Sequence, residues 1–422
     1  MAIGEHLEPT VGRLDSSICV TIETDGRDEA APQDPGHWPG DRVGRLQAIR
    51  DAGIVGLGGA VFPTAEKLGH EAACDLLILN GAECEPYISC DDMLMRERPM
   101  EILRGAIAMM ELLGAKRTVV VIERDKPKAV DAISAAADEL GDQRIHLTEV
   151  PTVYPAGGER QLVELLTGRE VPSGLYPIAV GCICQNVGTA YAVDRFIQLG
   201  EPLITRIVTV TGRGIKNPQN VEVPIGARVP ELIEFCGGYQ GDVARLILGG
   251  SMMGYPLRTD DLPVTKASNC IVAARSDEVR QTFAEWPCIR CGDCVPVCPA
   301  RLLPQEIFRA SKAHNSEELE ALGLSDCIEC GCCDVVCPSQ IPLTEYFREA
   351  KRALALETEH AALADVSQLR HELRSQRLVQ RQEETEGLRD RLKSEVSKSD
   401  GKEIIEAAVA RAKQRRGDNE TA

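Results

Sequence analysis

Two cysteine runs decide the fold of this chain: residues 288–299 read CIRCGDCVPVCP, and residues 327–338 read CIECGCCDVVCP. Both fit the pattern C-x2-C-x2-C-x3-C-P, which holds [4Fe-4S] clusters in bacterial two-cluster ferredoxins. Three thiolates at three-residue intervals wrap one face of a cubane, and the fourth cysteine points to the other cluster. The ligand sets are therefore predicted to cross over, with Cys288, Cys291, Cys294 and Cys337 on one cluster and Cys298, Cys327, Cys330 and Cys333 on the other.

The alternative for these runs is structural zinc, which also uses all-cysteine tetrahedral sites. Zinc sites usually pair two separated Cys-x-x-Cys knuckles per ion, so two complete ferredoxin runs favour iron and sulfide. Cys332 is surplus, because taking it as a ligand breaks the spacing of Cys330 and Cys333. We interpret it as a small packing residue. The same interpretation holds for most cysteines outside the runs, which are Cys19, Cys74, Cys84, Cys90, Cys182, Cys184, Cys236 and Cys270.

Length and charge limit what the rest of the chain can do. At 422 residues the chain is too long to be only a ferredoxin. Its net charge of -18 repels phosphate backbones, so nucleic acid is not expected as a partner. The N-terminus lacks the pattern of a signal peptide, so we expect the reducing cytoplasm. The longest uncharged run, Val171–Val193, contains prolines, glycines and amides, and we expect no transmembrane helix there.

Short apolar runs alternate with helical periodicity from residue 42 to about residue 200, which predicts an α/β layer domain. Its expected strands are Leu76–Asn80, Thr118–Ile122 and Ile145–Val150, and its expected helices are Pro99–Leu113 and Lys128–Leu140. Residues 201–275 carry β-branched strands between glycine turns, which indicates a separate small α+β domain. Its expected elements are strands Arg206–Val210 and Val221–Val223 and a helix Pro230–Phe235.

The end of the chain is dense in Glu, Arg, Lys and Ala. After the ferredoxin-like segment of residues 280–345, this composition predicts a long charged helix with a frayed end over residues 346–422. Its leucines form i,i+4 pairs but no sustained heptad, so a coiled coil is not favoured.

A glycine-rich segment, GIVGLGGAVFPTAEKL (residues 53–68), lies near the start of the α/β domain. It places Gly56, Gly58 and Gly59 before a helix that carries Lys67. Glycines let main-chain N–H groups approach a phosphate, and the lysine can neutralise it. The alternative is a simple turn, because the spacing is neither a Walker loop nor G-x-G-x-x-G after a strand.

Three further polar loops follow strands or open helices. Asn80, Glu83 and Glu85 lie at the carboxyl end of a strand, where open α/β sheets bind ligands. The segments Tyr154–Glu159 and Gln185–Thr189 each open a helix. Exposed turns are the alternative for each loop by itself. Together, the four loops more plausibly form one ligand-binding site than four unrelated turns.

These motifs resemble the C subunit of the Rnf (Rsx) ion-translocating electron transport complex, the RnfC/RsxC family. The resemblance runs from residue 42 to about residue 352 and rests on the glycine-rich segment, on the two cysteine runs, and on NGAECEPYISCDDMLM (80–95), VYPAGGERQLVELLTG (153–168), CQNVGTAYAV (184–193) and ILGGSMMGY (247–255). That family is in turn similar to the FMN- and NADH-binding subunit of respiratory complex I. The resemblance implies a flavin-binding α/β domain over 42–200, an SLBB-like β-grasp domain over 201–275, and the two-cluster ferredoxin domain.

The resemblance also implies roles for particular residues. FMN is expected at the four loops, with its phosphate or ribityl chain at Gly56, Gly58, Gly59 and Lys67 and its polar edge at Asn80, Asn186 and Thr189. The nicotinamide nucleotide is expected toward Phe62, Glu83 and Glu159, the last two being the candidate catalytic residues. The implied activity is electron relay, in which hydride from NADH reduces FMN and single electrons pass through the clusters.

The implied partners are NAD(H), the membrane subunits of the complex and an iron–sulfur subunit, with the chain peripheral on the cytoplasmic face of the bacterial inner membrane. Members of this family open with a lipoyl-like sandwich domain, whereas residues 1–41 resemble only its last strands, including Ile18–Ile22, and a linker. We therefore expect an N-terminally shortened chain whose start codon was assigned too late. Val61 departs from the family too, because glycine or another small residue often occupies its position.

Two other functions fit the same motifs. One is a soluble flavin and iron–sulfur reductase, such as the cobalamin reductases, which would need no membrane partner. The other is a non-catalytic scaffold whose clusters only brace the fold, which would bind no flavin. Sequence indicates neither the direction of electron flow, nor the ion moved, nor the final electron acceptor.

Overall fold

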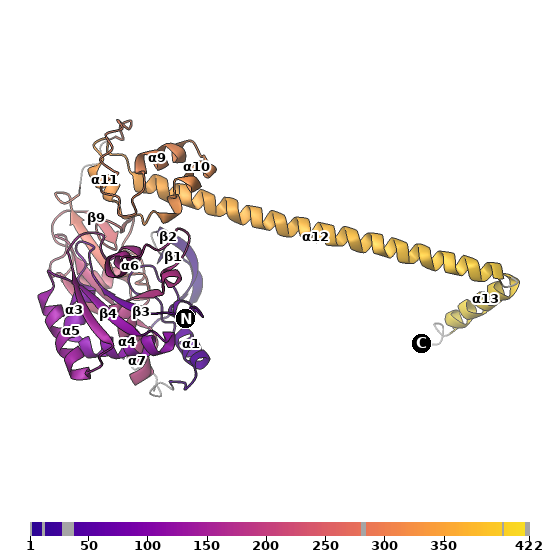
Figure 1. Ribbon diagram of the computed structural model, residues 1–422, viewed down its shortest axis with the longest axis horizontal. Coiled ribbons are helices and arrows are strands. Elements are labelled where there is room, and N and C mark those ends of the chain that lie inside the picture. The colour runs from indigo at the N-terminus through magenta and orange to yellow at the C-terminus, as the bar shows by residue number, and fades with distance from the viewer. Residues whose placement is uncertain (1, 11–12, 28–37, 280–283, 399–400, 418–422) are drawn as a thin grey trace. The chain divides into compact units, whose positions relative to one another are not determined.

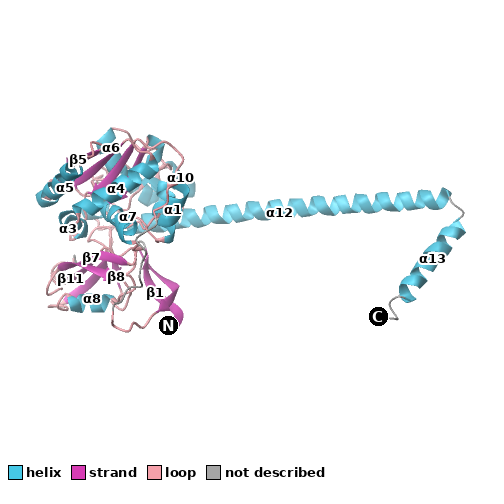
Figure 2. Ribbon diagram, turned by 90° about the horizontal axis from the view of Figure 1, so that it is seen from below, coloured by secondary structure: helices cyan, strands magenta, loops and turns pink. Residues whose placement is uncertain are grey.

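The computed structural model describes residues 2–10, 13–27, 38–279, 284–398 and 401–417. Residues 1–350 form one compact unit, and residues 351–422 form a second. The strands of the described residues fall into a hairpin, a four-stranded sheet and a five-stranded sheet. Figure 2 shows the two larger sheets as separate groups of strands, one labelled β5 and the other β7, β8 and β11.

The four-stranded sheet is parallel throughout and has the strand order β5-β4-β3-β6. Its strands are β3 (Leu76–Gly81), β4 (Arg117–Glu123), β5 (Ile145–Val150) and β6 (Cys182–Asn186). The helices are α1 (Arg42–Asp51), α2 (Thr64–Leu68), α3 (Cys90–Glu97), α4 (Pro99–Leu113), α5 (Pro127–Leu140), α6 (Glu159–Thr167) and α7 (Val187–Leu199), with a 3-10 turn at Pro177–Val180. The strands and helices predicted for this region are confirmed within a residue or two at each end.

Both faces of this sheet are covered, because successive side chains of a strand point to opposite faces. Leu77 and Leu79 of β3 belong to the large core formed with α1, α3, α4, α5 and α7. Leu76 and Ile78 belong to a smaller core with α6. The result is a three-layer α/β/α arrangement (Figure 1), in which the carboxyl ends of β3 and β6 lie at the same edge of the sheet.

The five-stranded sheet has the order β10-β9-β11-β7-β8. Its elements are β7 (Thr205–Thr211), β8 (Gln219–Pro224), α8 (Val229–Phe235), β9 (Val243–Leu248), β10 (Tyr255–Leu257) and β11 (Cys270–Arg275). Val208 and Val210 of β7 pack with Leu232 and Ile233 of α8 in a core of their own. The predicted α+β character of this region is confirmed.

The cysteine-rich region contains short helices and no strand among its described residues. Its elements are α9 (Pro304–Lys312), α10 (Ser316–Ala321), a 3-10 turn (Leu324–Asp326) and α11 (Cys332–Val336). It ends where α12 (Leu343–Lys398) begins, and the first turns of α12 are anchored by buried Leu343 and Phe347.

The two ends of the chain form a hairpin and helices. β1 (Ala2–Thr10) pairs antiparallel with β2 (Arg13–Thr21), so the strand expected at Ile18–Ile22 begins earlier and has a partner. Most of the acidic linker expected after it lies outside the described residues. α12 is drawn as one continuous helix in Figure 1, and α13 (Gly401–Gly417) follows it. Beyond residue 350 nearly every described side chain is exposed, as the charged composition predicted. Within the described ranges, no helix combines the length and the apolar character that crossing a membrane requires.

Candidate functional site

The structure brings each predicted set of cluster ligands together around its own cavity. One cavity is lined by Cys288, Cys291, Cys294 and Cys337. The other is lined by Cys298, Cys327, Cys330 and Cys333, with Cys332 also at its wall. The fourth cysteine of each run thus lies with the first three of the other. Burial raises the pKa of the Cys330 thiol to about 12, so a bound cation is needed to hold its thiolate.

The two cysteine runs have left-handed residues at matching positions of the main chain. Corresponding residues are left-handed in both, namely Arg290 and Glu329 (φ 57° and 58°), Gly292 and Gly331 (84° and 75°), and Arg301 and Gln340 (54° and 52°). Positive φ is uncommon outside glycine, so its repetition at matching positions indicates a shared requirement of the two loops. Main-chain loops of this kind present N–H groups to anionic iron–sulfur clusters. The donor set and the loops therefore fit two [4Fe-4S] clusters.

The glycine-rich segment forms a closed loop between α1 and α2. Its base is held by hydrogen bonds from Gly56 N to Phe62 O (2.8 Å) and from Thr64 N to Ile54 O (3.2 Å). At its tip Gly58 is exposed, and Gly59 has a φ of 112° with open space where a side chain would be. No hydrogen bond among the described residues uses the N–H groups of these two glycines.

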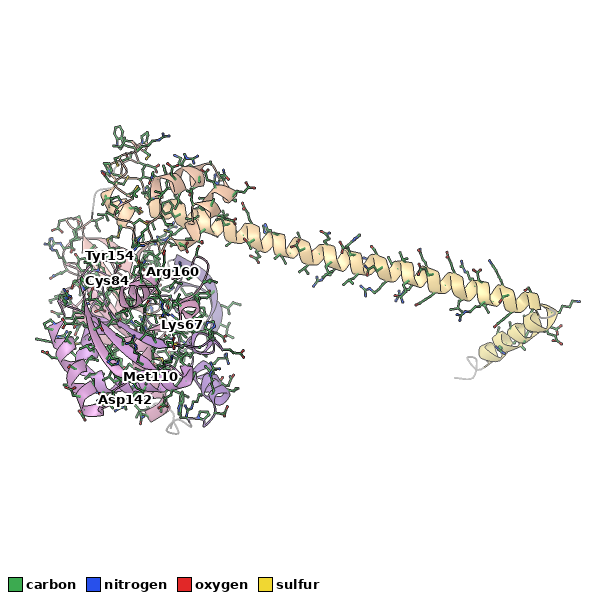
Figure 3. All side chains as sticks on the ribbon, viewed as in Figure 1. Lys67, Cys84, Met110, Asp142, Tyr154 and Arg160 are labelled. Carbon is green, nitrogen blue, oxygen red and sulfur yellow. The ribbon has the colours of Figure 1, made fainter. Side chains whose placement is uncertain are left out.

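The other predicted flavin loops converge on this loop. Gly58 lies against the side chain of Asn186, which would be 3.5 Å from a Cβ at that glycine. Lys67 Nζ donates to Glu159 Oε1 at 2.6 Å, which joins α2 to the start of α6. Asn80 Nδ2 donates to Gly157 O at 2.8 Å, which joins the end of β3 to the loop that precedes α6. Figure 3 labels Lys67 among the residues of this region. Free main-chain donors in a loop that is followed by a lysine-bearing helix fit the phosphate of FMN.

Glu83 is bound to the start of α3. Its carboxylate accepts hydrogen bonds from the N–H groups of Asp91 (2.9 Å) and Asp92 (3.1 Å). Burial raises the pKa of Glu83 to about 8, and the charge of Asp91 adds to that rise. Asp91 in turn accepts from Asn186 Nδ2 at 2.6 Å. Asp91 and Asn186 therefore link Glu83 to the glycine loop.

Two other residues predicted to contact the cofactors, Thr189 and Phe62, lie in different surroundings. Thr189 is fully buried, and its Oγ1 accepts a hydrogen bond from Leu57 N at 2.9 Å. This hydroxyl thus supports the glycine loop from behind. Phe62 is 44% exposed at the edge of the loop, where its ring is open to a ligand.

Three residues of this region make contacts that the sequence did not predict. Tyr154 donates its hydroxyl hydrogen to Cys330 O at 2.6 Å, which joins the 153–159 loop to a cluster loop. Glu85 accepts from Met252 N at 2.6 Å, which joins the end of β3 to the five-stranded domain. Arg206 donates to Leu57 O at 3.1 Å. One signal was present for Arg206, since it shares the buried face of β7 with apolar Val208 and Val210.

The α/β domain also forms ion pairs with the cysteine-rich region. Arg160 Nη1 lies 2.8 Å from Asp326 Oδ1, and Arg301 Nη2 lies 2.5 Å from Glu164 Oε1. Tyr154 and Arg160, labelled in Figure 3, come from the loop and the helix that contact this region. The cluster cavity with Cys330 therefore adjoins the flavin loops.

Three family models match successive parts of the chain. The Nuo51 FMN-binding domain matches residues 49–195, the SLBB domain matches residues 207–256, and the 4Fe-4S dicluster domain matches residues 287–341. These matches confirm the predicted fold classes and the predicted cofactors, FMN and [4Fe-4S] clusters.

Two crystal structures of the NAD+-reducing [NiFe]-hydrogenase share the fold. The air-oxidized structure matches with a TM-score of 0.51 and 22% identity over 72% of this chain and 63% of that chain. The H2-reduced structure matches with a TM-score of 0.50 and 20% identity over 74% of this chain and 61% of that chain.

Curated relatives are more similar in sequence. The C subunit of the ion-translocating oxidoreductase complex of Pseudomonas aeruginosa is 44% identical over 77% of this chain and 42% of its own length. The corresponding C subunits of Rhodobacter capsulatus and Erwinia tasmaniensis are 43% and 40% identical, over 77% and 74% of this chain and 63% and 39% of their own lengths. The chain spans about 39% to 63% of these relatives. Over about three quarters of its length, the chain is therefore similar to the C subunits of ion-translocating oxidoreductase complexes, as its sequence motifs predicted.

Proposed function

We propose that this chain is the electron-transfer subunit of a membrane-bound, ion-translocating oxidoreductase complex. In this role it passes electrons between NADH, by way of FMN, and partner subunits through two [4Fe-4S] clusters. The hydrogen bond from Tyr154 to the carbonyl of Cys330 carries the proposal. It joins a loop of the flavin site directly to the main chain that holds a cluster ligand, so the two redox sites are neighbours.

The residues of the glycine loop are assigned to binding FMN. The free N–H groups of Gly58 and Gly59 and the ammonium of Lys67 would hold the phosphate. Glu159, which pairs with Lys67, and the exposed ring of Phe62 would face the nicotinamide nucleotide. FMN, when bound, supplies the conversion between a two-electron hydride and single electrons.

The two clusters are assigned an order. The cavity with Cys330 and Cys333 is the inner one, since both thiols are buried and its loop contacts Tyr154. Cys288 and Cys291 of the other cavity are exposed, and so is the neighbouring Ile289. We therefore assign the inner cluster to exchange with the flavin and the outer cluster to exchange with a partner subunit.

The relatives' names supply the proposed setting. A relative named as one lettered subunit of a complex implies other subunits, which we take to include membrane subunits and an iron–sulfur subunit. We propose that the chain lies peripherally on the cytoplasmic face of the bacterial inner membrane. NADH:ferredoxin-type specificity is part of the same proposal.

The test is a cofactor analysis of the full chain followed by an anaerobic titration. Iron, sulfide and FMN are measured on reconstituted protein, and NADH is then added while flavin absorbance and the EPR signals of the clusters are followed. We expect bleaching of the flavin and reduced-cluster signals. Zinc in place of iron would overturn the cluster assignment.

This experiment and two further measurements, corrinoid reduction and co-purification with membranes, separate the competing functions. A scaffold would bind no flavin and show no bleaching by NADH. A soluble reductase of the cobalamin type would reduce a corrinoid without any membrane partner. Failure to co-purify with membranes that contain the other subunits would contradict the proposed complex.

A further inference from the structure

One peptide of the glycine loop is held from both sides by side chains. Leu57, which lies between Gly56 and Gly58, donates its N–H to Thr189 Oγ1 at 2.9 Å. Its carbonyl accepts a hydrogen bond from Arg206 Nη2 at 3.1 Å. Thr189 belongs to α7 of the flavin domain, whereas Arg206 belongs to β7 of the β-grasp domain. The position of the loop therefore depends on both domains.

Arg206 is buried to an extent that is unusual for a guanidinium. It is 6% exposed, and burial lowers its pKa. Its hydrogen bonds go to two main-chain carbonyls, Leu57 O and Ser268 O, the latter through Nε at 3.2 Å. Burying a charge is costly unless it gains such bonds, so a residue needed only to fill the space would be apolar.

The two hydrogen bonds of Arg206 determine the direction in which its guanidinium points. The Nε bond anchors Arg206 within its own domain, because Ser268 precedes β11. Since the guanidinium is planar and rigid, anchoring Nε also fixes where Nη2 points. The group thus reaches from a fixed place in the β-grasp domain to the glycine loop.

Holding the Leu57 carbonyl also orients the next N–H. In a trans peptide the carbonyl of one residue and the N–H of the next point in opposite directions within one plane. With Leu57 O directed to Arg206, the Gly58 N–H is directed away from it. Gly58 is exposed, and its N–H has no partner among the described residues.

We propose that Arg206 is a positioning residue of the flavin site, through which the β-grasp domain orients the Gly58 N–H toward the phosphate of FMN. The inference rests on the proposed function, in which the glycine loop binds FMN. The β-grasp domain then shapes the site without contacting the ligand.

FMN binding to the full reconstituted chain tests this assignment. Arg206→Gln is too short to reach Leu57 O, and Arg206→Lys keeps the charge but not the planar fork. Arg228→Gln, which alters an exposed ion pair in the same domain, is the matched control. Loss of a hydrogen bond from a charged group predicts that FMN binds about tenfold more weakly to Arg206→Gln. The FMN affinity of Arg206→Lys is expected to lie between those of Arg206→Gln and wild type. The control, Arg228→Gln, is expected to bind FMN as tightly as wild type does.

Hydrogen exchange on the FMN-free chain provides a readout that does not depend on activity. We expect faster exchange at residues 54–62 in Arg206→Gln, with exchange in β3 and β4 unchanged. A merely structural role would instead lower the melting temperature without a selective effect on this loop or on FMN affinity. Should Arg206→Gln fail to fold, Arg206→Lys decides, and wild-type affinity together with wild-type exchange in it would overturn the assignment.

The outcomes separate this inference from the proposed function. Wild-type chain that binds no FMN would overturn the proposed function and this inference with it. Wild-type chain that binds FMN, together with a folded Arg206→Gln that binds it equally tightly, would overturn only the role of Arg206.

Discussion

Val61 has a strained backbone conformation in the flavin loop. Its φ of 53° lies in the left-handed region, which a β-branched residue rarely adopts. Such strain persists where the surroundings enforce it, and it costs on the order of 1 to 3 kcal/mol. Here the closed base of the loop, with Gly56 bonded to Phe62 O, supplies the constraint. The sequence already set this position apart from the family pattern, and the structure adds its conformation.

Replacing Val61 by glycine is expected to relieve this strain. Because glycine is also more flexible in the unfolded chain, the net gain is on the order of 1 kcal/mol. We expect a small rise in the melting temperature, measured by thermal denaturation. Because the valine side chain would also crowd a flavin that approaches the backbone here, we expect severalfold tighter FMN binding, measured by fluorescence titration. Val61→Ala, which removes the branch but keeps a Cβ, is the control and should gain less. FMN binding that is weaker in Val61→Gly than in Val61→Ala would contradict this expectation.

Glu83 predicts a pH dependence of stability. Its pKa rises from an ordinary 4.5 to about 8 in the folded chain, mainly through burial and further through Asp91. Between these values the folded chain keeps a proton that the unfolded chain releases. The stability that the Glu83 proton contributes to the folded chain is therefore fully present below about pH 4.5 and is lost as the pH rises through 8.

Glu83→Gln should remove part of this dependence, since its side chain stays neutral. In thermal or urea unfolding, the stability of the variant relative to wild type is expected to increase as the pH rises from about 5 to about 8. Glu139→Gln, at an exposed helix position, is the control. A difference between Glu83→Gln and wild type that does not change with pH would count against a raised pKa.

The ferredoxin region shows at the scale of elements how a short pattern specifies a structure. The two runs have matching left-handed residues, matching turns and matching cysteine positions. Each loop brings three cysteines to one cavity, and the residue that follows its turn belongs to the other cavity. The spacing was enough to predict these sets, because the loop geometry repeats wherever such a cluster is held.

Pairs of cysteine substitutions test the crossing. If Cys337 serves the same cluster as Cys291, then Cys337→Ala combined with Cys291→Ala should retain about half of the iron, as each single variant does. Cys337→Ala combined with Cys330→Ala should lose nearly all of it. Iron analysis with EPR of the reduced protein makes the measurement. Cys332→Ala is the control and should keep both clusters. Equal losses in the two double variants would refute the assignment.

In the compact unit as a whole, the flavin domain is joined to each of the other domains by specific contacts. Tyr154 and Arg160 reach the cysteine-rich region, and Glu85 accepts from the turn before β10. Arg206 reaches back from the β-grasp domain. These contacts bring the three matched domains together around one set of loops. The contacts between the flavin domain and the cysteine-rich region are the ones that the proposed electron relay requires.

Tyr154→Phe tests the contact between the flavin site and the inner cluster. The ring is kept, but the hydrogen bond to Cys330 O, a contribution of about 1 kcal/mol, is lost. In anaerobic stopped-flow measurements we expect NADH to bleach the flavin at the wild-type rate and the clusters to be reduced severalfold more slowly. Tyr176→Phe, at an exposed tyrosine, is the control. Unchanged cluster reduction in Tyr154→Phe would remove the main support for the proposed electron path.

By itself, the sequence determined the features that depend on local pattern. Cysteine spacing specified the ligand sets, apolar runs specified strands such as β3 and β4, and the charged composition specified the exposed helix after residue 350. Tertiary structure alone decided which side chains support the flavin loops. Arg206 and Leu57 are 149 positions apart, and Tyr154 and Cys330 are 176 apart. Such contacts arise when domains pack against one another, and no periodicity within a segment records them. Glu83 shows the same limit, because its place at the strand end was readable whereas its engagement by α3 was not.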